Sequence, residues 1–227
     1  MYRKFVNARS PMRLLEKGLH GGLGVGNLGA CIAGHGVGKS SFLVGVAIDE
    51  LLRGGTVLHV ALDQTVSHVR DYYDTVYLAL AESTHLDEPI AIHAEIDNQR
   101  RIRSYRRDSF SASKLSDALK VEAEAGVRPS LIVIDGLEVS QITGDDLAGI
   151  RALAHDLAAE VWFTLDADGA QGQSAALSGV EDLISVVVTL ESKGDEITLR
   201  AIKDHENEDL HDLHVGLDPR TLLLVRS

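Results

Sequence analysis

The stretch Ala33-Gly34-His35-Gly36-Val37-Gly38-Lys39-Ser40 decides the fold that we expect for this chain. It runs Ala or Gly, four free positions, Gly, Lys and then Ser or Thr, which is the spacing of a phosphate-binding loop. Apolar residues from Leu28 to Ile32 precede it and an apolar helical pattern follows it. The alternative is a glycine-rich turn that happens to precede Lys-Ser, and the predicted strand and helix on either side argue against it.

Each residue type in this stretch has a physical role in holding a phosphate. The glycines let the backbone turn its N–H groups inward, and the positive end of the following helix dipole points at the same anion. Lys39 would reach the outer phosphates, and the hydroxyl of Ser40 would complete the shell of a bound Mg²⁺. The predicted nucleotide contacts are therefore Gly34, His35, Gly36, Val37, Gly38, Lys39, Ser40 and Ser41.

Composition limits the classes of protein that fit. The chain has 227 residues, a formal net charge of −12 and 44% hydrophobic residues, which suffices for a sizeable core. An acidic surface repels a phosphate backbone, so nucleic acid is disfavoured as a partner unless a local basic patch overrides the total. No uninterrupted apolar run of about 18 residues and no signal segment is visible, so we expect a cytoplasmic protein without membrane insertion.

The first 20 residues differ in character from the rest of the chain. They hold five lysines and arginines against Glu16 alone, which predicts a solvated N-terminal arm. A short helix would follow it from Ser10-Pro11, because proline suits the first helical position. Residues 21–227 would then form a single domain, which a glycine-rich loop at His20–Leu28 leads into its first strand.

Alternating strand and helix patterns follow the phosphate loop. We expect strands at 56–62, 131–135 and 161–165, and helices at 41–53, 66–80, 111–124 and 145–160. Continuous apolarity in Leu131–Ile134 indicates a strand that is buried on both faces, as in a parallel sheet covered by helices. Asp135 ends this strand where ligands bind in open α/β folds, so we expect it to serve the magnesium shell beside Ser40. A helix-capping or loop aspartate is the alternative.

The structure or role of two further segments is less clearly marked by their sequence. The apolar run Ile90–Ile92 is consistent with an edge strand. Residues Arg100–Arg107 hold five arginines in eight positions, the only dense basic cluster in the chain. In order of preference, they fit a solvated loop, a contact with a subunit or partner, or a single-stranded nucleic-acid contact with Tyr105 stacking.

The last third of the chain changes character. Residues 167–180 are rich in Gly, Ser, Ala and Gln and predict a mobile loop. No lysine or arginine occurs between Arg151 and Lys193. The segments 184–190, 197–202, 213–217 and 222–225 have the pattern of successive strands with short turns, which predicts a small antiparallel extension of the sheet.

With the glycine-rich lead-in, the phosphate loop and the strand ending in Asp135, the chain resembles the RecA-like ATPase core, in a layout most like KaiC-like and DnaB-like ATPase domains. The resemblance extends over roughly residues 12–227. It implies an α/β RecA-like P-loop NTPase fold with a mostly parallel central sheet. It also implies ATP and Mg²⁺ as ligands, and a homo-oligomer with nucleotide near the subunit boundary.

The resemblance also implies catalytic roles. Lys39, Ser40 and Asp135 match the family pattern, whereas the catalytic glutamate of the family corresponds to Asp63, which is a methylene shorter. The family's Lys-x-Arg pair, which reaches a neighbour's γ-phosphate, corresponds to Lys203 and His205, so the lysine is kept and the arginine is lost. Because an arginine supplied in trans accelerates phosphoryl transfer by orders of magnitude, we expect slow turnover or stimulation by a partner.

Three functions follow as hypotheses. The first is a slow Mg²⁺-dependent ATPase that acts as a KaiC-like switch or motor on a protein partner. The second is a non-hydrolysing nucleotide-sensing module that controls assembly. The third, a nucleic-acid-dependent ATPase, is the least supported, because the family's DNA-contacting loop corresponds to residues 167–180, which carry no cation.

Overall fold

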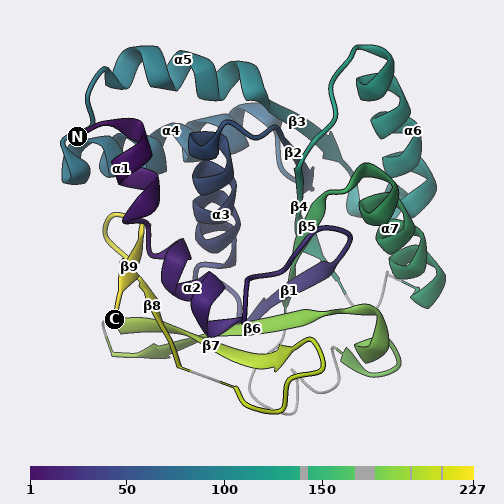
Figure 1. The fold of residues 1–227 in the computed structure, drawn as a ribbon. Coiled ribbons are helices and arrows are strands. Elements are labelled where there is room, and N and C mark those ends of the chain that lie inside the picture. The colour runs from purple at the N-terminus through teal and green to yellow at the C-terminus, as the bar shows by residue number, and fades with distance from the viewer. Residues whose placement is uncertain (139–142, 167–176, 195, 211) are drawn as a thin grey trace.

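The computed structural model of the chain describes residues 1–138, 143–166, 177–194, 196–210 and 212–227. Within these residues a single sheet is flanked by helices (Figure 1). Its strands are β1 (Leu28–Ala33), β2 (Val57–Leu62), β3 (Arg100–Tyr105), β4 (Leu131–Leu137), β5 (Glu160–Asp166), β6 (Val186–Lys193), β7 (Glu196–Asp204), β8 (Asp212–Leu217) and β9 (Leu224–Arg226). The helices are α1 (Arg3–Ala8), α2 (Met12–Gly18), α3 (Lys39–Arg53), α4 (Val66–Thr84), α5 (Pro89–Gln99), α6 (Ala112–Glu124) and α7 (Gly144–Leu157), with short 3₁₀ turns at Arg107–Ser109 and Glu181–Leu183.

The sheet combines a parallel half and an antiparallel half. The strand order is β3-β2-β4-β5-β1-β6-β7-β8-β9. Strands β1 to β5 pair in parallel, and β6 pairs in parallel with β1. From β6 onward the pairs are antiparallel. The expected α/β fold, with a mostly parallel central sheet and a C-terminal antiparallel extension, is therefore confirmed.

Each face of the parallel half buries its own hydrophobic core. Helices α1 to α5 cover one face, where the core includes Phe42 and Tyr73. Helices α6 and α7 lie together over the other face, where the core includes Leu115 and Ile150 (Figure 1). Strands β1, β2, β4 and β5 are almost completely buried, because both of their faces are covered.

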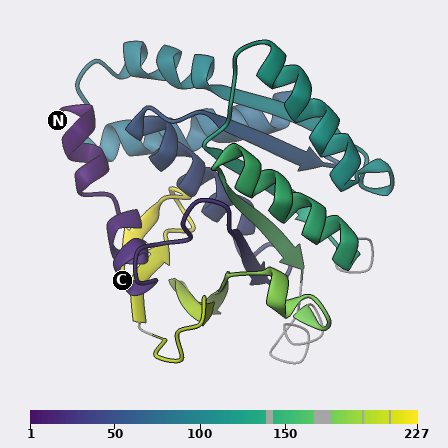
Figure 2. The same cartoon turned by 45° about the vertical axis from the view of Figure 1, so that its right-hand side comes forward.

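The N-terminal segment is folded, so the expectation of a solvated arm is wrong. Residues Arg3–Ala8 form α1, which packs on α3 and buries Val6. Helix α2 begins next to Ser10-Pro11 as expected, and it packs against β8 near the C-terminus (Figure 2). The buried side chains of Met12 and Leu15 join the same core as α3.

The expectation of an edge strand at Ile90–Ile92 is also wrong, because these residues lie in helix α5. Pro89 opens this helix, and Ile92 and Ile96, four residues apart, face the core. Ile90, by contrast, is 86% exposed. The three apolar residues therefore belong to a helical pattern that starts at a proline.

The arginine-rich segment supplies the edge strand. It forms β3, so the preferred interpretation as a solvated loop is wrong for Arg100–Tyr105. Arg100 is buried, with its guanidinium 4.4 Å from the centre of the Tyr73 ring. Arg103 points to the other face and pairs with Glu122 of α6 at 2.5 Å. Partners on both faces of β3 thus offset the positive charge of these arginines. A charged edge strand also discourages pairing with another chain.

Candidate functional site

A pocket of about 410 Å³ lies at the carboxyl ends of the central strands. Its walls come from the loop after β1, the end of β2, the end of β4 and the end of β5. The chain leaves β1 and β2 toward the face covered by α3 and α4, and it leaves β4 toward α7 on the opposite face. Divergent connections of this kind open a crevice in α/β sheets. A larger, mostly apolar pocket of about 710 Å³ near both termini contains none of the phosphate-loop side chains.

The loop between β1 and α3 forms a cradle of unpartnered backbone donors. The N–H groups from Gly36 to Ser41 donate no hydrogen bond to any described residue. Gly36 and Gly38 have φ angles of 75° and 113°, which side-chain-bearing residues rarely adopt. Helix α3 begins directly behind them, so its positive dipole end meets the same space. This donor set fits an anion such as a phosphate.

Lys39 is held at this cradle by three acceptors. Its Nζ lies 2.9 Å from the carbonyl oxygen of Ala33, 2.7 Å from that of Gly34 and 2.6 Å from Oδ1 of Asp166. An ammonium group has three donors, and all three are engaged. A phosphate would therefore displace at least one of these acceptors from Lys39.

Asp135 lies next to the cradle and is fixed from two sides. It is 4% exposed at the end region of β4. Its Oδ1 accepts from the hydroxyl of Thr164 at 2.9 Å, and its Oδ2 accepts from the amide of Gln64 at 3.3 Å. Each carboxylate oxygen keeps a further lone pair. With the hydroxyl of Ser40 in the same pocket, these oxygens fit the hard, oxygen-only ligation that Mg²⁺ requires.

The structure separates some of the expected site residues. His35, Gly36, Gly38, Lys39, Ser40, Ser41 and Asp135 line the pocket, and the carbonyl of Gly34 binds Lys39. Asp63 and Val37 are not among the lining residues. The Asp63 carboxylate accepts from the backbone N–H of Arg107 at 3.0 Å instead. Lys203 lies on β7 and donates to the carbonyl of Glu181, so it is also outside the pocket of its own chain.

The pocket residues that the sequence analysis did not assign to the site include Gln64, Arg107, Thr164 and Asp166. Each of these four lies near the carboxyl end of a parallel strand, and that position is the signal that could have found them. Asp135 was predicted by the same rule. Of the arginine-rich segment, Arg107 alone lines this pocket. Tyr105, the expected stacking residue, packs instead against Phe110, with ring centres 5.8 Å apart.

Neutral polar groups form the floor of the pocket. The hydroxyls of Ser41 and Tyr72 share a hydrogen bond, and burial raises the pKa of Tyr72. His59 is 1% exposed, with Nδ1 3.1 Å from the Tyr73 hydroxyl. Burial lowers the pKa of His59 to about 4, so its ring is uncharged near neutral pH. Its Nε2 has no hydrogen-bond partner among the described residues.

The antiparallel extension closes one side of the site. A Cβ at Gly38 would lie 2.3 Å from Cδ2 of Leu217 on β8, so any larger residue would have to displace that side chain, and the φ of 113° also favours glycine. Leu222, in the turn between β8 and β9, also lines the pocket. The C-terminal strands therefore contact the loop between β1 and α3 although they lie far from it in the sequence.

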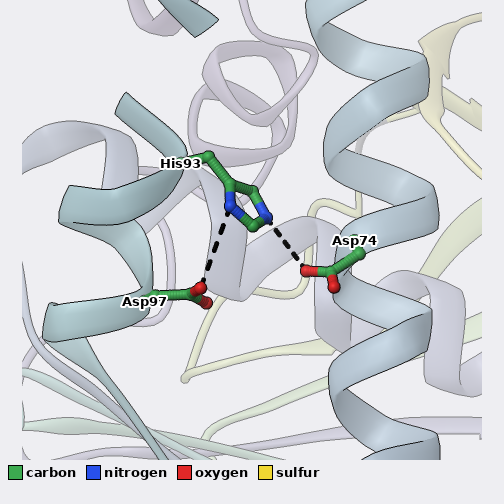
Figure 3. Close-up of side chains that lie close together, drawn as sticks. All are labelled: Asp74, His93 and Asp97. Carbon is green, nitrogen blue, oxygen red and sulfur yellow. Dashed lines mark hydrogen bonds and ion pairs between the residues drawn. The ribbon is translucent and has the colours of Figure 1, made fainter. Parts of the chain in front are cut away.

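A second cluster of ionisable groups joins α4 to α5 (Figure 3). Nε2 of His93 lies 2.9 Å from Asp74, and Nδ1 lies 3.8 Å from Asp97. Asp97 also pairs with Arg100 at 2.5 Å. The ligand atoms are within 4.8 Å of one another, but the two carboxylates face different nitrogens of the ring (Figure 3). We therefore assign this cluster to holding the two helices together.

Comparisons with known proteins do not assign this chain to a family. No family model and no curated protein matches the chain. None of the helices in the described part of the chain combines the length and apolarity that crossing a bilayer requires. The pocket at the carboxyl ends of the strands is therefore the feature that points to a function.

Proposed function

We propose that this chain is a RecA-like P-loop protein that binds ATP with Mg²⁺ and hydrolyses it slowly, as a switch acting on a protein partner. The observation that carries the proposal is the row of unpartnered N–H groups from Gly36 to Ser41 beside Lys39. Such a row supports binding of a multiply charged anion, and Ser40 with Asp135 supports a magnesium ion next to it.

Each residue then has a defined task. The backbone cradle and Lys39 hold the phosphates, and Ser40 with Asp135 serves the metal shell. Thr164 and Gln64 keep the Asp135 carboxylate in one orientation. When bound, Mg²⁺ supplies positive charge that stabilises the leaving phosphate oxygens. Slow turnover follows because the Asp63 carboxylate, the expected water-orienting group, is engaged by Arg107.

The test is a comparison of wild-type protein with Lys39→Ala. Calorimetry with Mg·ATP should give binding for the wild type and a loss of at least about 10-fold in affinity for Lys39→Ala, because a charge-assisted phosphate contact is removed. A steady-state phosphate-release assay should show turnover that the variant lacks. Absence of heat and of a thermal shift at millimolar Mg·ATP would refute the proposal.

The second candidate is a nucleotide-sensing module without catalysis, and the engaged state of Asp63 favours it. In that case a nonhydrolysable ATP analogue should change the elution volume in size-exclusion chromatography while phosphate release stays at the Lys39→Ala level. The assembly would be a homo-oligomer with nucleotide near the subunit boundary. Lys203, which is outside the pocket of its own chain, would then contact the site of a neighbouring copy.

A further inference from the structure

We propose that Arg107 binds the terminal phosphate of a nucleoside triphosphate from within the same chain, and so distinguishes triphosphate from diphosphate. The inference rests on the proposed function and adds a ligand-sensing residue to it. Arg107 follows the edge strand β3 and opens the 3₁₀ turn Arg107–Ser109. Among the residues that line the pocket, Lys39 and Arg107 are the two lysine or arginine side chains.

The guanidinium of Arg107 is placed over the end of β4. Its Nε donates to the carbonyl of Gly136 at 2.8 Å, directly after Asp135. Gly136 has a φ of 92°, a backbone conformation that favours glycine, and the position its Cβ would take is in ordinary van der Waals contact with Nη2 at 3.4 Å. Nη2 has no hydrogen-bond partner among the described residues, and the side chain is 27% exposed. One edge of the guanidinium can therefore still accept a ligand.

Two carboxylates hold Arg107 in this position. Nη1 pairs with Glu138, and Nε lies 3.7 Å from Oδ2 of Asp63. Both pairs are partly exposed, so solvent weakens each of them. A phosphate group, which carries more charge and accepts two parallel hydrogen bonds from a guanidinium, competes well with such pairs.

The two cations approach the pocket from different strands. Lys39 follows β1 and its Nζ contacts Asp166 at the end of β5, whereas Arg107 contacts the end of β4, the strand next to β5. Neighbouring strands lie about 5 Å apart. The phosphate loop beside β1 would hold the inner phosphates, and the chain of phosphates would extend toward β4. A terminal phosphate would then meet Arg107, whereas a diphosphate would end before it.

The experiment measures two affinities for each variant by calorimetry: that for Mg²⁺ with a nonhydrolysable ATP analogue and that for Mg·ADP. Arg107→Ala should weaken the triphosphate analogue at least about 10-fold and leave ADP within about 2-fold. The matched control is Arg106→Ala, because Arg106 is 81% exposed, pairs with Asp108 and does not line the pocket. It should change neither affinity.

A second variant tests the same contact in the opposite direction. Glu138→Gln removes a carboxylate that holds Arg107, so it should tighten binding of the triphosphate analogue by about 2-fold or more without changing ADP. Equal effects of Arg107→Ala on both ligands, or no effect on either, would overturn the inference while leaving the proposed function intact. A wild-type protein that binds neither ligand would overturn both.

Discussion

His59 lines the pocket, and its lowered pKa makes the stability of the folded chain depend on pH. Its ring is buried in the middle of β2, and burial lowers its pKa to about 4, compared with about 6.5 for an exposed histidine. Between these two pH values the unfolded chain binds a proton at His59 and the folded chain does not. The free energy of unfolding therefore falls as the pH falls through this window, by up to about 1.4 kcal/mol per pH unit from this residue.

The check is urea denaturation of wild type and His59→Gln at several pH values. The wild type should lose about 2–3 kcal/mol more than the variant between about pH 7 and pH 4.5. His155→Gln serves as the control, because the His155 side chain is 86% exposed, and it should follow the wild-type profile. Parallel curves for wild type and His59→Gln would show that the ring titrates alike in both states.

Under the proposed function, Asp166 would compete with phosphate for Lys39, because the two side chains form an ion pair. The ion pair is 2.6 Å long and Asp166 is 46% exposed, so it contributes less than about 1 kcal/mol. Asp166→Asn should therefore tighten Mg·ATP binding by about 2- to 5-fold, measured by calorimetry. Asp156→Asn changes an exposed carboxylate that does not line the pocket and should leave the affinity unaltered. Weaker binding by Asp166→Asn would instead assign Asp166 to the ligand site.

At the scale of elements, α1 stabilises the end of α3. Arg3 donates to the carbonyls of Leu52 at 2.7 Å and Leu51 at 2.5 Å, in the last turn of α3, and pairs with Glu95 of α5 at 2.5 Å. The carbonyl of Leu51 also accepts from the N–H of Gly54 at 3.0 Å, but the last carbonyls of a helix carry partial negative charge, so a cation there stabilises the helix. Arg3→Ala should lower the free energy of unfolding by about 1–3 kcal/mol in chemical denaturation.

Lys4→Ala is the control for this contact, because Lys4 is an exposed neighbour whose ammonium lies over Phe5. It should change stability by less than about 0.5 kcal/mol. If Arg3→Ala also has no measurable effect, α1 is not a stabilising part of the domain.

The elements that sequence analysis predicted correctly are those with long, unambiguous patterns. An apolar pattern runs through the whole of the buried strand Leu131–Leu137 and of helix α3. The local sequence signal of each element therefore agrees with its buried surroundings. The region 89–105 was misassigned for two reasons. A three-residue apolar run carries no period, and two arginines of β3 have partners from distant elements, Arg100 from Tyr73 of α4 and Arg103 from Glu122 of α6. Such long-range contacts leave no local signal.

At the scale of the whole molecule, the site is assembled from segments that are distant in the sequence. A motif marks residues 33–40 and a strand end marks Asp135, so the sequence predicts that they share a site, and residues of both line one pocket. Gln64, Arg107 and Asp166 meet there only because the sheet order brings β2, β4, β5 and β1 side by side. That order depends on the pairing of buried strands, which the sequence patterns do not specify. The expected mobile loop at 167–180 lies mostly outside the described residues.

The most direct measurement of the central claim is a ¹H–¹⁵N correlation titration of the isotope-labelled protein with Mg·ATP. The account predicts large shifts for the amides from Gly36 to Ser41, whose N–H groups would gain phosphate acceptors, and small shifts for strand β9 beside the larger apolar pocket. Unchanged amides from Gly36 to Ser41 at saturating Mg·ATP would contradict the account, as would shifts confined to the apolar pocket.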